Sequence, residues 1–119
     1  MKHGESNLQK NCVKWFDLSY PLLKPLLFAV PNGHKRNKIT AAILKAEGVR
    51  AGVADMFFAY PVKIPKQYSG LFIEFKFGKN KQTDSQIEFQ KLVERQGYRY
   101  EVVCEFDHFR NLIDNYLGE

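Results

Sequence analysis

The stretch that decides the fold is LFIEFKF, residues 71–77. Alternate side chains of a β-strand share a face, so this run has one wholly apolar face and one mixed face. The apolar face carries Leu71, Ile73, Phe75 and Phe77, and the other face carries Phe72, Glu74 and Lys76. The pattern predicts a strong strand.

Glu74 and Lys76 are the first candidates for chemistry. On a strand they project from the same face, roughly 7 Å apart. Burying a charge costs several kcal/mol unless the charge is paired or binds a metal ion. An exposed edge strand would carry the same pair without cost. The pair therefore needs a partner elsewhere in the chain before it indicates a site.

Hydrophobic spacing and turn residues predict the elements on either side of this strand. Helices are expected over residues 5–18, 37–47, 84–96 and from residue 107 onward, and strands over residues 26–30, 55–62 and 98–104. In the second helix, Ile39, Ala42, Ile43 and Ala46 form the face expected to point inward. The order α-β-α-β-β-α-β-α predicts one α/β domain over residues 1–119, with a mixed central sheet flanked by helices.

Composition narrows the class of protein. A chain of 119 residues suffices for one domain, and its net charge of +5 suits a polyanionic partner or simply solubility. Cys12 and Cys104 show no zinc-ligand spacing, which predicts two reduced thiols. With no apolar signal segment and no run of about 20 apolar residues, the protein is expected to be soluble and cytoplasmic.

Asp55 is the partner that Glu74 and Lys76 need. It begins the predicted strand of residues 55–62 and lies 19 residues before Glu74. If this strand pairs with residues 71–77, a bulge or twist must bring Asp55 beside Glu74, because the two lie at unequal distances from the turn. Two carboxylates that meet hold a hard divalent cation, with the Phe75 carbonyl as a further ligand. We therefore predict a Mg²⁺ site that Mn²⁺ can also fill.

This set of residues suits hydrolysis of a phosphodiester bond. A bound cation lowers the pKa of a water molecule and neutralises charge on the scissile phosphate. Lys76 is expected to hold or help deprotonate the attacking water and to stabilise the anionic transition state. The set lacks the paired nucleophile and base of an acyl-transfer enzyme.

The spacing of Asp55, Glu74 and Lys76 is similar to that of the PD-(D/E)xK nuclease superfamily. More specifically, the chain resembles a stand-alone VRR-NUC domain, the virus-type replication-repair nuclease. The matching positions are Pro31-Asn32-Gly33, Arg36, Gly48, Gly52, Asp55, Leu71 to Lys76, Ser85, Gln86 and Gly97. Ala54 stands where the superfamily name has proline, a position that only sets the approach of the backbone.

The resemblance implies a restriction-endonuclease-like fold and two further site residues. Glu5 matches a glutamate on the N-terminal helix that helps bind the metal, although a first-turn glutamate also suits the helix dipole. Gln86 matches a catalytic glutamine, although with Thr83 it can also form a capping box.

Basic residues beside the predicted centre are expected to contact the DNA backbone. They are Lys35, Arg36 and Lys38 after the Pro-Asn-Gly turn, and Lys79 and Lys81 after the strand. Phosphate contacts read no base sequence, so structure-selective cleavage is expected. Two alternatives stay open: a DNA-binding module without catalysis, and an RNA-cleaving nuclease on the same fold.

A homodimer is expected as well. Single-domain members of the family resemble dimeric enzymes that cut four-way (Holliday) junctions, which implies branched DNA as the substrate. One centre cuts one strand, so paired cuts need two centres related by a two-fold axis. The first helix and the apolar segment of residues 20–27 could form the contact between subunits, or the segment could pack on its own sheet.

Overall fold

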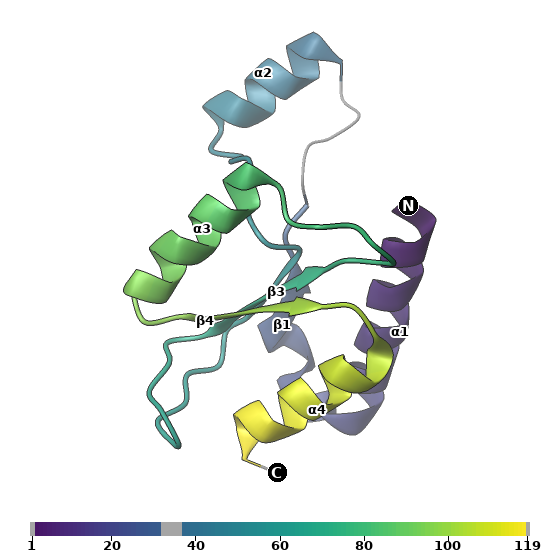
Figure 1. The fold of residues 1–119 in the computed structure, drawn as a ribbon, viewed down its shortest axis with the longest axis vertical. Coiled ribbons are helices and arrows are strands. Elements are labelled where there is room, and N and C mark those ends of the chain that lie inside the picture. Colours follow the sequence, from purple (N-terminus) through teal and green to yellow (C-terminus); the bar gives the residue numbers. More distant parts are fainter. Residues whose placement is uncertain (1, 32–36, 119) are drawn as a thin grey trace.

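A four-stranded mixed sheet forms the centre of the protein, with helices on both of its faces (Figure 1). The computed structural model describes residues 2–31 and 37–118. In chain order the elements are α1 (Lys2–Ser19), the 3₁₀ helix η1 (Pro21–Leu26), β1 (Leu27–Ala29), α2 (Lys38–Ala46), β2 (Met56–Phe58), β3 (Leu71–Phe75), α3 (Asp84–Arg95), β4 (Arg99–Val103) and α4 (Phe106–Leu117).

The strand predicted from LFIEFKF, β3, is an inner strand of the sheet. The strand order is β1-β2-β3-β4, with β3 antiparallel to β2 and parallel to β4. The parallel pair is joined through α3, which lies over one face of the sheet, while α1 and α4 cover the other (Figure 1). The predicted fold class, a mixed sheet flanked by helices, is therefore confirmed.

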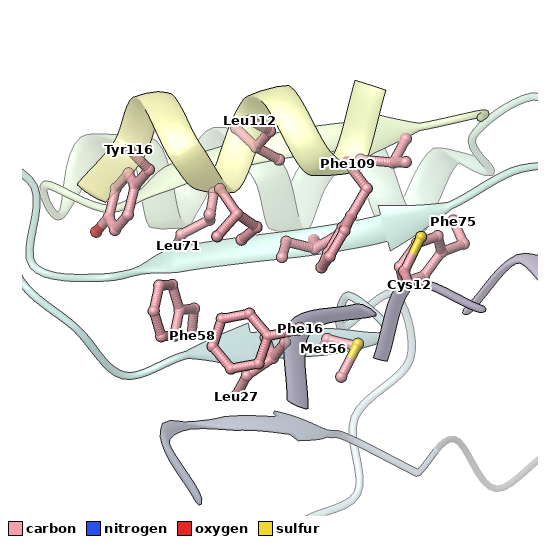
Figure 2. Close-up of a cluster of buried hydrophobic side chains, with 13 residues drawn as sticks. Cys12, Phe16, Leu27, Met56, Phe58, Leu71, Phe75, Phe109, Leu112 and Tyr116 are labelled. Atoms are coloured by element: carbon pink, nitrogen blue, oxygen red, sulfur yellow. The ribbon is translucent and has the colours of Figure 1, made fainter. Parts of the chain in front are cut away.

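The apolar face of β3 packs into the main core (Figure 2). Cys12 and Phe16, one turn apart on α1, are fully buried, as the spacing of the first helix predicts. The ring of Phe16 meets that of Phe58 at 5.4 Å between centroids, and Phe75 meets Phe109 of α4 at 6.0 Å. These contacts hold β3 in place between its neighbouring strands.

The other face of β3 meets α3. Phe72 packs on Phe89 of α3 with 5.1 Å between ring centroids. Glu74 and Lys76 alternate with the core residues and so share the face of Phe72. Both are buried. The exposed edge strand that would have made this charged pair harmless is excluded.

Three strand and helix boundaries differ from the prediction. The strand expected over residues 55–62 ends at Phe58, and Pro61, which has no amide hydrogen, cannot continue a ladder. The strand expected to reach Phe77 ends at Phe75, which leaves the Phe77 side chain 49% exposed. The 3₁₀ helix Pro21–Leu26, which has a proline at its start and Pro25 inside it, was not predicted.

The predicted inward face of α2 is wrong. Its four apolar residues are all exposed, and Ile39 and Ile43 are 75% and 52% exposed. Other helices already cover both faces of the sheet, and α2 stands away from it (Figure 1). The helical period was predicted correctly, but there is no core for this face to enter.

Both cysteines are free thiols, as predicted. Cys12 is buried in the core, and burial raises the pKa of its thiol to about 12. The thiol therefore stays protonated at neutral pH. None of the helices in the described part of the chain is long and apolar enough to cross a membrane.

Gly52 joins the loop before Asp55 to the start of α3. Its φ is +85°, a conformation that favours glycine. A Cβ atom at this position would lie 2.3 Å from the backbone carbonyl oxygen of Ser85, too close for any side chain. Gly48 also has a positive φ, +106°, but open space surrounds its Cβ position. Substituting each glycine in turn therefore distinguishes the effect of backbone strain from the effect of steric contact.

We predict that Gly52→Ala destabilises the protein more than Gly48→Ala. Each substitution forces alanine into the left-handed region, at about 1 kcal/mol. Only Gly52→Ala also pushes the loop away from Ser85. In thermal unfolding, Gly48→Ala should lower Tm by a few degrees and Gly52→Ala by clearly more. Equal losses would show that the contact with Ser85 contributes nothing.

Candidate active site

The register of β2 and β3 brings Asp55 to Glu74. Met56 pairs with Ile73 in this antiparallel ladder, so one step further along places Asp55 opposite Glu74. The predicted bulge is absent, because β2 ends at Phe58 and residues 59–70 form a long connection instead of a tight turn. Asp55 and Glu74 seemed to lie at unequal distances from the turn because part of this connection was counted as strand.

Asp55 is held by the backbone of β3. Its Oδ2 accepts a hydrogen bond of 2.7 Å from the Phe75 amide. Burial raises the pKa of the Asp55 carboxyl, and the nearby carboxylates of Glu74 and Glu5 raise it further, against the lowering effects of the Phe75 hydrogen bond and the Lys76 ammonium. Three carboxylates and one ammonium therefore influence the same small region.

Glu74 lies at the bottom of this region, with no exposed surface. Its Oε1 accepts a hydrogen bond from the hydroxyl of Tyr100. Its Oε2 lies 3.2 Å from the Nζ atom of Lys76. That ion pair lacks the geometry of a hydrogen bond, so the buried Oε2 atom accepts none. An ionised oxygen with unused acceptor capacity is suited to a cation.

Lys76 follows the last residue of β3. Its amide still bonds the Val103 carbonyl of β4, at 3.0 Å, so the backbone stays fixed to the sheet. Glu74 and Lys76 are the two charged residues that are buried among those the structure describes. The charged pair that the sequence singled out is therefore buried on both counts.

Glu5 reaches the same region from α1. Its carboxylate accepts a hydrogen bond of 2.9 Å from Asn80, in the loop after β3. Glu5 also lines a groove with Asp55. The groove has a volume of about 900 Å³ and runs along one stripe of α1, lined by Glu5, Ser6, Gln9, Lys10, Val13, Lys14, Asp17, Leu18 and Asp55. Because Glu5 and Asp55 both line it, this groove is the open side of the site.

Gln86 lines a different hollow from Glu5 and Asp55. Its side-chain oxygen accepts a hydrogen bond of 2.8 Å from the backbone amide of Thr83. Its backbone amide donates to the Thr83 hydroxyl at 3.3 Å, which completes a capping box. It lines a second hollow of about 510 Å³, together with Leu44 and Gly52. Its capping role is therefore present in the structure, and none of its hydrogen bonds reaches Asp55 or Glu74.

Three of the five predicted DNA contacts, Lys38, Lys79 and Lys81, lie among the described residues. Lys79 and Lys81 are exposed in the loop that follows β3, and Lys38 is exposed at the start of α2. Lys35 and Arg36 lie outside the described residues. Phe75, predicted to offer its carbonyl to the metal, donates its amide hydrogen to Asp55.

Tyr100 was not predicted as part of the site. It lies on β4 and is buried. Strand alternation could have identified it, because Tyr100 pairs with Phe72 and so shares the face of Glu74. The missing information was the parallel register of β3 and β4, which sequence spacing does not reveal.

The arrangement fits a magnesium ion better than a metal held entirely by protein ligands. Among residues 2–31 and 37–118, no three His, Cys, Asp or Glu side chains gather closely enough to form a metal cluster. Mg²⁺ sites commonly use one or two carboxylates and take their other ligands from water and substrate phosphate. The Asp55 carboxylate and the unbonded Oε2 of Glu74 meet that requirement.

Comparison with known proteins agrees with this geometry. A solved structure titled "VRR_NUC domain protein" superimposes with a TM-score of 0.80 over 96% of this chain and 88% of the other, at 24% sequence identity. That likeness establishes a shared fold. No curated protein matches the sequence.

The sequence also matches a family model over most of its length. The model of the VRR-NUC domain family matches residues 2–105, a range that includes Glu5, Asp55, Glu74 and Lys76. Because this range is most of the 119-residue chain, the protein belongs to the VRR-NUC domain family, which is a family of nucleases.

Proposed function

We propose that this protein is a divalent-metal-dependent DNA endonuclease that selects branched or junction DNA by its structure. The observation that carries the proposal is the group of Asp55, Glu74 and Lys76, in which Glu74 and Lys76 are buried and Asp55 lines the groove. Burying a carboxylate and an ammonium costs free energy. A site for a cation and a phosphodiester gives these charges a use that a merely structural cluster does not.

In the proposed mechanism, Asp55 and Glu74 hold Mg²⁺, with Glu5 at the margin of the site. When bound, the cation supplies an acidified water and neutralises charge on the scissile phosphate. The hydrogen bond from the Phe75 amide fixes the carboxylate of Asp55. Lys76 is 10% exposed, so its charge is little screened by water. Its ammonium orients the attacking water and stabilises the negative charge that develops on the phosphate.

The groove along α1 is the proposed path of the cleaved strand. Its residues recur three and four positions apart, so they line one face of the helix. Lys10 and Lys14 lie one turn apart on this face, and both are exposed. Asp17, at the far end, lies 3.9 Å from Lys24, which offsets its charge. Lys10 and Lys14 form no ion pair with any residue that the structure describes, so their ammonium groups suit a phosphate backbone.

The predicted structure selectivity follows from these contacts. Lysine at a groove wall binds phosphate and carries no information about base sequence. Selection then depends on whether a DNA shape lets one strand enter the groove and reach Asp55.

We expect Asp55→Asn to abolish cleavage while the protein stays folded and binds DNA. The amide keeps the shape of the side chain and removes the charge that would bind metal. Stability should be unchanged or higher, because a desolvated carboxylate near two others is lost. Glu74→Gln is a poorer test, since it leaves buried Lys76 without its counter-charge. Asp107→Asn, on the exposed surface of α4, is the matched control.

Cleavage should be measured on a branched DNA and on an RNA duplex of the same sequence, with and without Mg²⁺. The proposal expects cutting of the DNA by the parent protein only when Mg²⁺ is present. Binding without cutting would identify a DNA-binding module, and faster cutting of the RNA would identify a ribonuclease. Cleavage by Asp55→Asn at more than a few per cent of the parent rate would refute the role of Asp55.

The double variant Lys10→Gln/Lys14→Gln should weaken DNA binding and leave the rate at saturating DNA unchanged. Loss of two phosphate contacts should reduce the slope of log affinity against log salt by about 2. Lys63→Gln/Lys91→Gln removes the same charge from exposed positions outside the groove and is the control. Equal effects of the two double variants would leave only net charge as the cause.

We further propose that the enzyme works as a homodimer, which supplies the second centre needed for paired cuts. Leu23, Leu26 and Leu27 of the segment first considered for the contact pack on the core, which leaves Leu22 exposed at 93%. The exposed face of α2 offers a second apolar surface, with Ile39 and Ile43. Because α2 lies apart from the sheet, it can reach a partner without disturbing the core (Figure 1).

Light scattering at micromolar concentration should give a mass of about twice the 13.9 kDa of one chain. Ile43→Asp and Leu22→Asp place a charge on one apolar surface each. The variant that restores the mass of a single chain identifies the contact. A parent protein that remains at the single-chain mass, with or without junction DNA, would leave a monomeric nicking enzyme.

A further inference from the structure

Tyr100 donates a hydrogen bond to the carboxylate of Glu74. The tyrosine lies on β4, opposite Phe72 of β3, and its side chain is 5% exposed. Both partners of the bond are therefore buried and belong to adjacent strands of the same sheet. The contact reaches Glu74 from the side opposite to β2, which carries Asp55 toward the site.

Gln82 completes the surroundings of the Tyr100 hydroxyl. Its Nε2 donates to that hydroxyl at 3.4 Å and to Oε1 of Gln90 at 3.0 Å. The second bond determines which end of the Gln82 amide faces Tyr100. Because an amide nitrogen only donates and a carboxylate only accepts, the hydroxyl proton must point toward Glu74. Glu74, Gln82 and Gln90 together therefore fix the direction of the hydrogen bond from Tyr100 to Glu74.

The bond from Tyr100 makes the two oxygens of Glu74 unequal. Oε1 is occupied by the hydroxyl. Oε2 accepts no hydrogen bond and faces the Lys76 ammonium at 3.2 Å. Rotation about the last bond of a glutamate is soft, so an unrestrained carboxylate would turn its plane and move both oxygens out of these positions. The hydrogen bond from Tyr100 restricts that rotation.

We propose that Tyr100 is a positioning residue that holds Glu74 so that Oε2 faces the cation and Lys76. The inference rests on the proposed function and extends it to a residue outside the set of Asp55, Glu74 and Lys76. Tyr100 touches neither the cation nor the substrate. It acts through Glu74, as residues that orient a metal ligand from behind commonly do.

The test is Tyr100→Phe in the full chain, which removes one oxygen atom and keeps the buried ring. Loss of such an orienting contact typically weakens metal affinity about 10-fold or more. We expect that shift in Mn²⁺ affinity, measured by calorimetry without DNA, and in the Mg²⁺ concentration that gives half-maximal cleavage. Tyr98→Phe is the control, because the Tyr98 ring packs on Phe57 and Phe72.

The measurements separate this inference from the proposed function. If the parent binds Mn²⁺ and cleaves DNA, and Tyr100→Phe has the same Mn²⁺ affinity and Mg²⁺ requirement, the positioning role is refuted alone. A lower Tm with unchanged metal affinity also refutes it, since the hydroxyl would then be merely structural. A parent protein that binds no Mn²⁺ and cleaves nothing refutes both.

Discussion

Burying the carboxylate of Glu74 and the ammonium of Lys76 on an inner strand costs free energy that the surrounding contacts must offset. The ion pair offsets part of this cost, and the hydrogen bond from the Tyr100 hydroxyl offsets a further part. The rest of the sheet is arranged to make this possible. One face of β3 meets α1 and α4 through apolar residues alone, and this core gives the strand the stability to carry charges on its other face.

Much of this could be predicted from one strand. The alternation in residues 71–77 identifies the core face and the charged face, and both faces are confirmed. The meeting of Asp55 with Glu74 was expected only if a bulge or twist brought them together. Residues 59–62 were predicted to continue the strand, whereas β2 ends at Phe58 and its register with β3 needs no bulge. Register depends on where a strand stops, and strand ends are a weak signal in sequence.

Two other failures have different physical causes. The apolar period of α2 was read correctly, but the period of a helix says which residues share a face and nothing about what covers it. Tyr100 was missed because its partner lies 26 residues away, across a parallel pair of strands. Local pattern determines helices and strands, whereas parallel pairing is determined by packing of the whole domain. The close approach of Gly52 to Ser85 is of the same kind.

The connection from β3 through α3 to β4 has a consequence for how the site comes into being. Glu74, Lys76 and Tyr100 all lie within residues 71–103, in one continuous stretch of chain. Asp55 and Glu5 come from before it and join only when β2 has paired with β3 and α1 has packed on the core. A chain that has formed only the later stretch holds half of the proposed metal site and none of the groove. An emerging nuclease of this design would be harmless to nucleic acid until its fold is complete.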